Sequence, residues 1–317
     1  MSRVASLLLI FVSAFAFAEY PDRPIKLIVP FAAGAGTDAV ARFTAQKLEG
    51  QLKQHVVVEN RVGASGAIGT QAVANAAPDG YTLLFVASPF TTVAAATPAT
   101  ANYDPVKQFA PIALIAAGPL VWIANAQAPL TTIREMITYA KANPGKLTYG
   151  SAGTGGVNHL ALELFKLKTG TEILHVPYKG IAPAMTDLLG GSIMTLTGTI
   201  PAVLPYVKSG KARAMAVTGD KRSPLMPDVP TMKETGANGT EVYNYWGLAA
   251  PVGTPTAIVQ RLNAEVQKFL AQKDVQERLA ADGVDLTPGG PERLATFIAN
   301  DYNGWKKLVN DAKLQFE

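Results

Sequence analysis

The chain has 317 residues, of which 48% are hydrophobic and 16% are charged, and its formal net charge is +4. This length is sufficient for two domains of ordinary size, and the composition excludes a disordered, collagen-like or coiled-coil chain. The absence of cysteine excludes disulfides, cysteine-ligated zinc, thiol catalysis and a lipid-modified N-terminal cysteine. Positive charges are dispersed and do not alternate with aromatic residues, so we expect no nucleic-acid partner.

Residues 1–18 have the pattern of a cleaved secretory signal peptide. Arg3 precedes an apolar run from Leu7 to Ala18 that ends in Ala-Phe-Ala. The run is too short to span a membrane, and charged residues and prolines follow it at once. We therefore expect a periplasmic protein whose mature part is not embedded in the membrane.

Short apolar runs alternate with helical patterns, which is typical of parallel sheets covered by helices. The first series predicts strands at 25–31, 55–59 and 81–87 and helices at 37–48 and 66–76. The apolar stretch 111–126 contains prolines and Gly118, which predicts two buried strands. A second series predicts helices at 132–142, 157–168, 182–189 and 202–208 and strands at 147–149, 173–176, 193–197 and 212–218.

The C-terminal region is expected to pack on the strands and helices of the first series. A predicted strand at 246–251 precedes helices at 255–271, 274–281 and 291–313, which have too few strands to form a domain alone. This organisation predicts an α/β protein with a discontinuous lobe 1 (19–118 plus 225–317) and a lobe 2 (119–224). The chain would cross between the lobes near 116–121 and 219–246. Two crossings form a hinge, and the cleft beside a hinge favours a small-molecule site.

The segments 26–50 and 146–170 superpose without a gap at an offset of 120 residues. Each opens with Lys-Leu in a predicted strand, continues through a Gly-rich loop and ends a predicted helix at glycine. Asp38 aligns with Asn158 and Gly36 with Gly156. Few other pairs are identical, so the pattern indicates a shared supersecondary unit and not a proven duplication.

Both Gly-rich loops, 31–38 and 150–158, have the properties of an anion site without a cation. A helix N-terminus presents free N–H groups and the positive end of its dipole, and glycine lets a ligand approach the backbone. Neither loop contains Arg or Lys. A carboxylate could also bind the hydroxyls of Thr37, Ser151 and Thr154, each bond contributing about 1.5–3 kcal/mol. The alternative is two ordinary strand-to-helix turns, with Asp38 and Asn158 acting as caps.

Other turns follow predicted strands and would converge on the same crevice, at 63–66, 88–90 and 178–180. Tyr178 could form a wall of the site, and Lys179 could either add charge at the rim or be solvated. Trp246 and Tyr243 lie at the second crossing, where burial against the hinge is the interpretation preferred over ligand stacking.

A dinucleotide-binding hypothesis deserves weighing because Gly34-x-Gly36-x-x-Ala39 follows a strand and Glu59 ends the next one. The export signal, a second Gly-rich turn after Glu59 and the repeated loop at 150–158 argue against it.

Catalysis has little support. Ser151 lies in Tyr-Gly-Ser-Ala-Gly, which lacks the first glycine of a nucleophile elbow. His159 is not placed as a base for Ser151 and is interpreted as a residue that lines the cleft or caps the helix. His55 and His175 lie at strand ends, so no histidine pair has metal-ligand spacing. We expect no catalytic residues, no metal and no cofactor.

At these residues the chain resembles the extracytoplasmic substrate-binding proteins of tripartite tricarboxylate transporters, the Bug receptor family. The resemblance spans the whole mature chain and depends on the order and spacing of motifs that are weak singly. The N-terminal motifs are Pro30-Phe31-Ala32-Ala33-Gly34 with Thr37-Asp38 and Ala41-Arg42, Asn60-Arg61 with 63–66, and 77–83. The later motifs are 150–153, His159-Leu160, 176–180, 182–184, 187–191, 227–231, 246–248, 250–251 and 253–255.

The resemblance implies a type II-like periplasmic binding protein fold, in which each lobe is a mainly parallel sheet flanked by helices. It further implies a receptor, expected as a monomer, that closes on a small carboxylate ligand and delivers it to integral membrane subunits. Backbone groups of the two Gly-rich loops, often with ordered water, would hold one carboxylate. The candidate ligand-binding residues are Phe31, Ala33, Gly34, Ala35, Gly36, Thr37, Asp38, Ser65, Gly66, Ser88, Ser151, Ala152, Gly153, Thr154, Gly155, His159, Tyr178 and Thr197.

Two departures from the family pattern concern the ligand. The first loop reads Gly34-Ala35-Gly36 where the family commonly has adjacent glycines, and the stretch 194–201 carries Thr197 and Thr199 where relatives often have Asp or Asn. The distal end of the ligand is therefore open among dicarboxylates, tricarboxylates, amino acids and aromatic acids. The competing functional hypothesis is an exported enzyme or a nucleotide-cofactor protein that uses the first Gly-rich loop.

Overall fold

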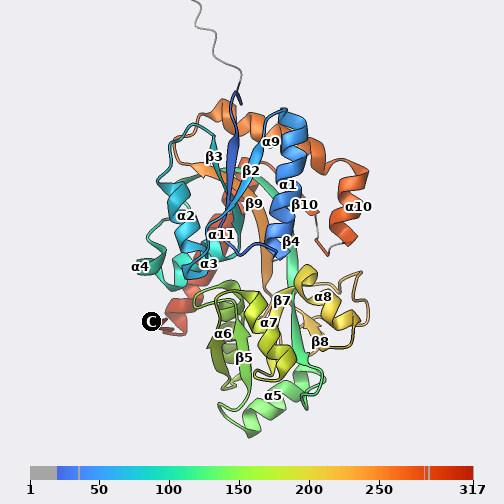
Figure 1. The fold of residues 1–317 in the computed structure, drawn as a ribbon. Coiled ribbons are helices and arrows are strands. Elements are labelled where there is room, and N and C mark those ends of the chain that lie inside the picture. The colour runs from blue at the N-terminus through green and yellow to red at the C-terminus, as the bar shows by residue number, and fades with distance from the viewer. Residues whose placement is uncertain (1–19, 35, 282, 285, 317) are drawn as a thin grey trace, which may run out of the picture.

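The computed structural model describes residues 20–34, 36–281, 283–284 and 286–316. The expected signal peptide at 1–18, and Ala35 of the first Gly-rich loop, lie outside these residues. Figure 1 shows a mixed α/β chain with two lobes, in which the N-terminal and C-terminal parts share the upper lobe and the middle of the chain forms the lower one. The expected α/β two-lobe fold class is confirmed.

Lobe 1 is built on a sheet in the order β2-β1-β3-β9-β4, with β10 also paired to β4. The parallel neighbours β1, β2 and β3 are joined to antiparallel β9, β4 and β10. The strands are β1 (Ile25–Val29), β2 (Val56–Asn60), β3 (Thr82–Ala87), β4 (Phe109–Asn125), β9 (Tyr243–Pro251) and β10 (Leu286–Gly289). Mainly parallel pairing therefore holds for the first three strands, and the long strands add the antiparallel pairs.

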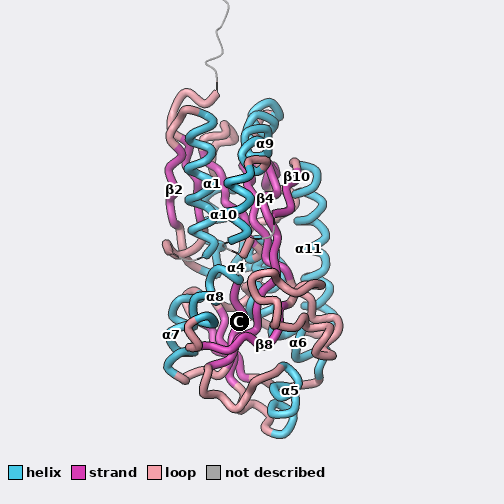
Figure 2. Tube along the Cα trace, turned by 90° about the vertical axis from the view of Figure 1, so that its right-hand side faces the viewer, coloured by secondary structure: helices cyan, strands magenta, loops and turns pink. Residues whose placement is uncertain are grey.

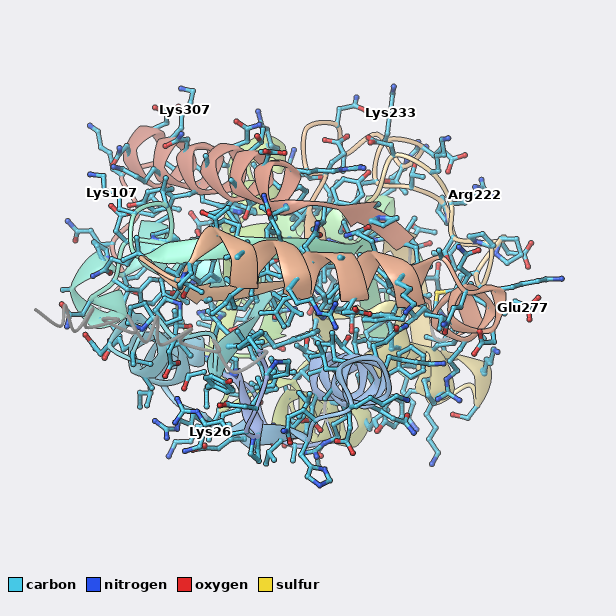
Figure 3. All side chains as sticks on the ribbon, turned by 90° about the horizontal axis from the view of Figure 1, so that it is seen from above. Lys26, Lys107, Arg222, Lys233, Glu277 and Lys307 are labelled. Atoms are coloured by element: carbon cyan, nitrogen blue, oxygen red, sulfur yellow. The ribbon has the colours of Figure 1, made fainter. Side chains whose placement is uncertain are left out.

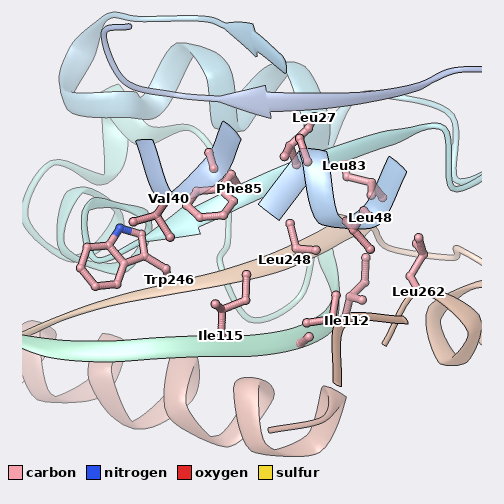
Figure 4. Close-up of a cluster of buried hydrophobic side chains, with 14 of the residues drawn as sticks. Leu27, Val40, Leu48, Leu83, Phe85, Ile112, Ile115, Trp246, Leu248 and Leu262 are labelled. Atoms are coloured by element: carbon pink, nitrogen blue, oxygen red, sulfur yellow. The ribbon is translucent and has the colours of Figure 1, made fainter. Parts of the chain in front are cut away.

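Helices cover both faces of this sheet because alternate strand residues are apolar on both sides. One face packs Leu27, Phe85 and Leu248 against α1, α9 and α10, a cluster seen in Figure 4. The other face packs Leu84 and Leu114 against α2, α3 and α11. The helices are α1 (Gly36–Leu52), α2 (Ala67–Ala74), α3 (Pro89–Ala96), α4 (Pro98–Ala101), α9 (Thr256–Leu270), α10 (Lys273–Ala281) and α11 (Pro291–Asp311), with a 3-10 turn η1 (Ala64–Gly66) before α2.

Lobe 2 repeats this arrangement around the end of β4. Strands β7, β5 and β6 follow β4 in order, and β8 pairs with β4 as well. Trp122 faces α5 and α6, and its neighbours Val121 and Ile123 face α7 and α8. The elements are α5 (Ile133–Ala142), β5 (Thr148–Ser151), α6 (Val157–Thr169), β6 (Leu174–Pro177), α7 (Ile181–Gly190), β7 (Thr195–Thr199), α8 (Ile200–Lys208) and β8 (Ala212–Val217).

The prediction of two strands in 111–126 is wrong, because β4 is a single strand that runs through both lobes. It pairs with β9 from Phe109 to Pro119 and with β7 and β8 from Leu120 onward. Proline removes a backbone donor, but Pro111 adjoins a register shift and Pro119 lies where β4 changes partner. The prolines therefore mark irregular pairing and do not end the strand.

Helix α3 and strand β10 are among the elements absent from the sequence prediction, and each was missed for a physical reason. Helix α3 has buried residues from Phe90 through Ala96, so it lacks the apolar and polar alternation of a surface helix. Strand β10 is short, contains Pro288 and pairs irregularly. Both lie in lobe 1, where α3 and β10 complete the packing around β4 and α11.

The C-terminal helices return to lobe 1 as expected, and α11 also reaches lobe 2. Figure 2 shows α11 running along the molecule on the side away from α1. Trp305 of α11 packs in one cluster with Leu160 of α6. Among the residues that the structure describes, no helix combines the length and apolarity needed to cross a membrane.

Charged side chains are distributed around the periphery. Figure 3 shows Lys26, Lys107, Arg222, Lys233 and Lys307 pointing outward from widely separated elements. This spread matches the dispersed charge of the sequence and gives no continuous basic face among the labelled residues.

We predict that Gly247→Ala destabilises lobe 1. A Cβ there would lie 2.8 Å from the carbonyl oxygen of Ala113 and 3.1 Å from Leu294, and overpacking of this kind costs about 1–3 kcal/mol. Urea unfolding of the mature chain measures the change. Gly50→Ala is the matched control, because no atom lies within 4 Å of its added Cβ and a helical glycine is about 0.5–1 kcal/mol worse than alanine. Equal stability of the two variants would contradict the packing argument.

Candidate functional site

The η1 turn of lobe 1 and the second Gly-rich loop of lobe 2 meet at the lobe interface. The hydroxyl of Ser65, in the η1 turn of lobe 1, donates to the Thr154 carbonyl of lobe 2 at 2.9 Å. A Cβ added to Gly153 would lie 2.4 Å from Ser65 Oγ, and one added to Gly36 would lie 3.2 Å from Thr199 Oγ1. The turn at 63–66 and the second loop are thus brought together, and Gly36 of the first loop lies opposite Thr199 of lobe 2. Glycine is needed at both close approaches.

The first loop is anchored by Asp38, which is 1% exposed. Asp38 Oδ2 accepts the Gly34 N–H and Arg42 Nε, both at 2.8 Å, while Oδ1 accepts Asn60 Nδ2 at 2.7 Å. Asn60 Nδ2 also donates to the Phe31 carbonyl at 2.9 Å. Burial raises the pKa of Asp38, but the hydrogen bonds from Arg42, Asn60 and Gly34 outweigh it and lower the pKa. Asp38 is therefore an ionised anchor whose oxygens already have partners.

The charge of Asp38 is balanced by Arg42 one helical turn later. Since an unpaired carboxylate at the N-terminus of α1 would repel an anion, this ion pair keeps the positive end of the helix dipole effective. The N–H groups in the first turn of α1 have no acceptor within the helix itself. They are the groups of this loop that can still bind a ligand.

The second loop is held by neutral groups. Ser151 Oγ lies 2.6 Å from His175 Nε2 and accepts the Gly153 N–H at 3.2 Å. The Gly155 N–H donates to His159 Nδ1 at 3.1 Å. The Gly153 and Gly155 N–H groups are thus occupied, and the first turn of α6 supplies the free N–H groups, as the first turn of α1 does in lobe 1.

The His159 and His175 rings stack with a centroid distance of 3.6 Å. Because Gly155 donates to Nδ1 of His159, the neutral ring carries its proton on Nε2, which lies 3.7 Å from Glu163 Oε1. Burial, His175 and Lys166 lower the pKa of His159 to about 3, and burial and Lys166 lower that of His175 to about 4. Both rings are uncharged at neutral pH.

Behind the second loop, Thr197 belongs to a buried polar network. Thr197 Oγ1 lies 2.6 Å from the Tyr149 hydroxyl, and Asn158 Nδ2 donates to the Thr197 carbonyl at 2.7 Å. Thr197 and Tyr149 are fully buried. Asn158 thus fixes the start of α6 against β7, and the Thr197 hydroxyl supports the loop from behind.

The remaining predicted residues occupy different places. Ser88 is fully buried, and its hydroxyl bridges the Tyr243 carbonyl and the Tyr245 N–H of β9. Thr37 Oγ1 accepts Trp246 Nε1 at 3.2 Å. Tyr178 is partly exposed and donates to Asp187 at 2.7 Å. Phe31, Ala33, Gly66 and Ala152 lie in or beside the two loops and the η1 turn, and Lys179 is exposed.

Trp246 and Tyr243 favour the hinge interpretation over ligand stacking. Trp246 is 1% exposed within the lobe 1 core, and its indole N–H is engaged by Thr37. The Tyr243 hydroxyl donates to Asp220 at 2.8 Å at the second crossing. The two aromatic residues therefore join the crossing segments to the lobes.

A cavity of about 400 Å³ opens from the first loop between α1, α7, α8 and α10. Gly34 and Gly36 form the end nearest the loop. The rest of its lining is Ala39, Val40, Phe43, Ile181, Ala182, Met185, Pro201, Ala202, Pro205, Tyr206, Arg278 and Leu279. The cavity joins the N-terminus of α1 to a largely apolar space between the lobes, and no described residue of the second loop lines it.

Three residues of this site were not among the predicted binding residues. Arg42 could have been found from its i,i+4 spacing to Asp38, and Asn60 from its place at the end of β2 beside β1. His175 is 24 residues from Ser151, and only the parallel pairing of β5 with β6 brings it to the loop. No local sequence signal indicated that contact.

Catalytic and cofactor interpretations gain no geometric support. Ser151 contacts a histidine, but Ser151 is fully buried and its hydroxyl serves the loop backbone. β3 is followed in the sheet by antiparallel β9, unlike the parallel order of a dinucleotide-binding half. Within the described ranges, no group of three or more His, Cys, Asp or Glu could hold a metal ion.

Comparisons with known proteins give a consistent result. A family model described as "Tripartite tricarboxylate transporter family receptor" matches residues 40–314. Protein BugT of Bordetella pertussis is 37% identical over 325 residues, covering 99% of both chains. The structure of the periplasmic binding protein BugD is 38% identical, with a TM-score of 0.87 over 93% of this chain and 99% of that one.

Two similar structures contain a ligand. Rpa4515 of R. palustris, solved with adipate, is 34% identical with a TM-score of 0.89 over 94% of this chain and 99% of that one. MatC of Rhodopseudomonas palustris, solved with bound malate, is 33% identical with a TM-score of 0.86 over 92% of this chain and 100% of that one.

We predict that Asp38→Ala loosens the first loop. The Gly34 N–H and the Asn60 amide would lose their acceptor, and an unsatisfied buried group costs about 1–3 kcal/mol. Urea unfolding should show a loss in this range. Arg23→Gln, which removes the exposed pair with Asp79, is the control and should change stability by less than about 1 kcal/mol. A larger loss in the control than in Asp38→Ala would refute the anchoring role.

We predict that acid destabilises the fold through the histidine pair. Both folded-state pKa values lie below the ordinary 6.5, so the unfolded chain binds protons first as the pH falls. The stability contribution is therefore complete above about pH 6.5 and is lost toward pH 4, at up to about 1.4 kcal/mol per pH unit per proton. Urea unfolding between pH 4 and 8 should show a smaller slope in His175→Gln. An unchanged slope would contradict the titration of His175.

Proposed function

Because the chain belongs to the tripartite tricarboxylate transporter receptor family, we propose that it captures a small carboxylate-bearing metabolite between its lobes and delivers it to the membrane subunits of such a transporter. The observation that most supports a carboxylate is that cation-free Gly-rich loops, each opening a helix, lie at the lobe interface in both lobes. The second loop is bonded to Ser65 of lobe 1, and Gly36 of the first loop lies beside Thr199 of lobe 2. The adipate and malate in two similar proteins are carboxylates as well.

In this proposal one carboxylate of the ligand lies between the first turns of α1 and α6. The N–H groups and dipoles of the two helices attract this carboxylate, and the hydroxyls of Thr37 and Thr154 can donate further hydrogen bonds to it. Asp38, Ser151, His159 and Thr197 shape the loops through the contacts described above. Ser65 closes the site by joining η1 to the second loop.

Closure is proposed to occur at the two crossings between the lobes, with lobe 1 at 19–118 plus 225–317 and lobe 2 at 119–224. β4 changes partner at Pro119, and the segment between β8 and β9 forms the other connection. Ligand binding between the lobes favours the closed arrangement, because only that arrangement brings both loops to one carboxylate. The receptor is proposed to act in the periplasm after removal of residues 1–18.

A ligand screen tests the function. The mature chain, unfolded and refolded to remove carried-over ligand, is heated with mono-, di- and tricarboxylates, amino acids, aromatic acids and nucleotides. A ligand at 100 times its Kd adds about 2.7 kcal/mol of stability and raises the Tm by several degrees. A Tm increase with carboxylates alone is expected. An increase only with NAD or a nucleotide would favour the cofactor-binding alternative and overturn the proposal.

We predict that Gly153→Ala weakens carboxylate binding by at least about tenfold. The added Cβ would lie 2.4 Å from Ser65 Oγ across the lobe interface, and the φ of +136° is unfavourable for alanine. Adding Ser65→Ala removes the clashing oxygen, so the double variant should recover part of the affinity. Calorimetric titration with the best ligand of the screen measures both. Undiminished affinity in Gly153→Ala would place the ligand elsewhere.

A further inference from the structure

The cavity beside the first loop offers backbone N–H groups at one end and mostly apolar side chains elsewhere. Gly34 and Gly36 form one end, where the N-terminus of α1 provides free N–H groups. From there the lining follows one face of α1, through Ala39 and Val40 to Phe43. Seven residues of helix correspond to about 10 Å. A molecule held by its carboxylate at α1 would therefore extend its other end along this cavity.

Beyond the α1 end of the cavity, the described residues of the lining include two polar side chains, Tyr206 of α8 and Arg278 of α10, and are otherwise apolar. Its walls are Ile181, Ala182 and Met185 of α7 together with prolines and alanine of α8. Among the described residues of the lining, Arg278 is the only charged one, and it is an exposed residue of α10. A carboxylate buried without compensating hydrogen bonds is strongly disfavoured, whereas methylene groups gain free energy on burial.

Lys179 does not alter this balance. It lies in the turn before α7 and is exposed, and it is not among the cavity residues. Thr199, which carries a hydroxyl near the entrance, lies 3.2 Å from the position of a Cβ on Gly36. The carboxylate end thus carries the free N–H groups of α1, whereas the described side chains of the cavity are apolar apart from Tyr206 and Arg278.

We propose that this cavity selects acids with one carboxylate and an extended apolar distal part, in preference to dicarboxylates of the same length. This inference rests on the proposed function, since it assumes that a carboxylate binds at the start of α1. The size of about 400 Å³ suits a small ligand. Selectivity comes from the cost of placing a second charge among Phe43, Ile181 and Met185.

Hexanoate and adipate provide the direct comparison, because both have six carbons and differ only in the distal methyl or carboxylate. Propionate tests the carboxylate end without filling the cavity. Calorimetric titration of the refolded mature chain should give a Kd for hexanoate at least about tenfold lower than that for adipate or malate. Adipate is a demanding competitor, since it is the ligand in the similar Rpa4515 structure.

Ala39→Leu and Ala182→Leu test the location. Both alanines line the cavity from different lobes, and both are exposed on helices, so leucine is compatible with folding. Each variant should weaken hexanoate binding at least about fivefold and change propionate binding less than about twofold. Ala142→Leu is the matched control and should behave as the unmodified chain, because Ala142 is exposed and its helix α5, at the bottom of Figure 1, contributes no residue to the cavity lining.

The outcomes separate this inference from the proposed function. Adipate or malate binding as tightly as hexanoate, or more tightly, overturns the inference and leaves the carboxylate receptor intact. A loss of adipate affinity in Arg278→Gln would then identify that guanidinium as the partner of the distal carboxylate. Unchanged hexanoate affinity in both leucine variants also overturns the inference. Binding of no carboxylate at all contradicts the proposed function, and this inference with it.

Discussion

The first Gly-rich loop depends on the ion pair between Asp38 and Arg42. This pair keeps the start of α1 attractive to an anion although the carboxylate of Asp38 is buried there. Helix N-termini favour negative charge, so Asp38 would compete with any anionic ligand if its charge were unpaired. Arg42 balances that charge, and Asn60 and the Gly34 N–H occupy the remaining oxygen capacity. The loop is thereby ordered by an ion pair that adds almost no net charge, and the dipole of α1 stays available.

In lobe 2 the Gly-rich loop is also ordered at a helix start, but uncharged side chains hold it in place of an ion pair. The stacked His159 and His175 rings fix Ser151 and the Gly155 N–H without an ion pair, and burial together with Lys166 keeps both rings uncharged at neutral pH. A charged His159 would need a proton on Nδ1, where Gly155 already donates. The repeated strand, loop and helix unit is therefore held by different side chains in the two lobes. In both lobes the groups that can attract an anion belong to the backbone.

The sequence predicted what is local and missed what depends on pairing between distant segments. The β1 and α1 unit and the β5 and α6 unit follow from apolar runs, glycines and helix patterns, so the two loops were located correctly. The contact between Ser151 and His175 needs the pairing of β5 with β6, and the continuity of β4 needs β9, β7 and β8 as partners. Helix α3 was missed because burial on all sides removes its periodicity. The predicted ligand contacts remain predictions, although the structure brings the second loop against Ser65 and Gly36 of the first loop against Thr199.

The connection between lobes explains how a weak attraction from backbone groups can become a specific signal. Each lobe alone offers one helix N-terminus, and a single exposed site of this kind contributes only about 0.3–1 kcal/mol to anion binding. Closure adds the second helix and excludes water, so the two contributions act on one carboxylate in a less polar environment. Contacts such as Ser65 with Thr154 form only when the lobes meet. In the proposed function, ligand binding and lobe closure therefore share one equilibrium, and a transporter that recognised the closed lobes would recognise the loaded receptor.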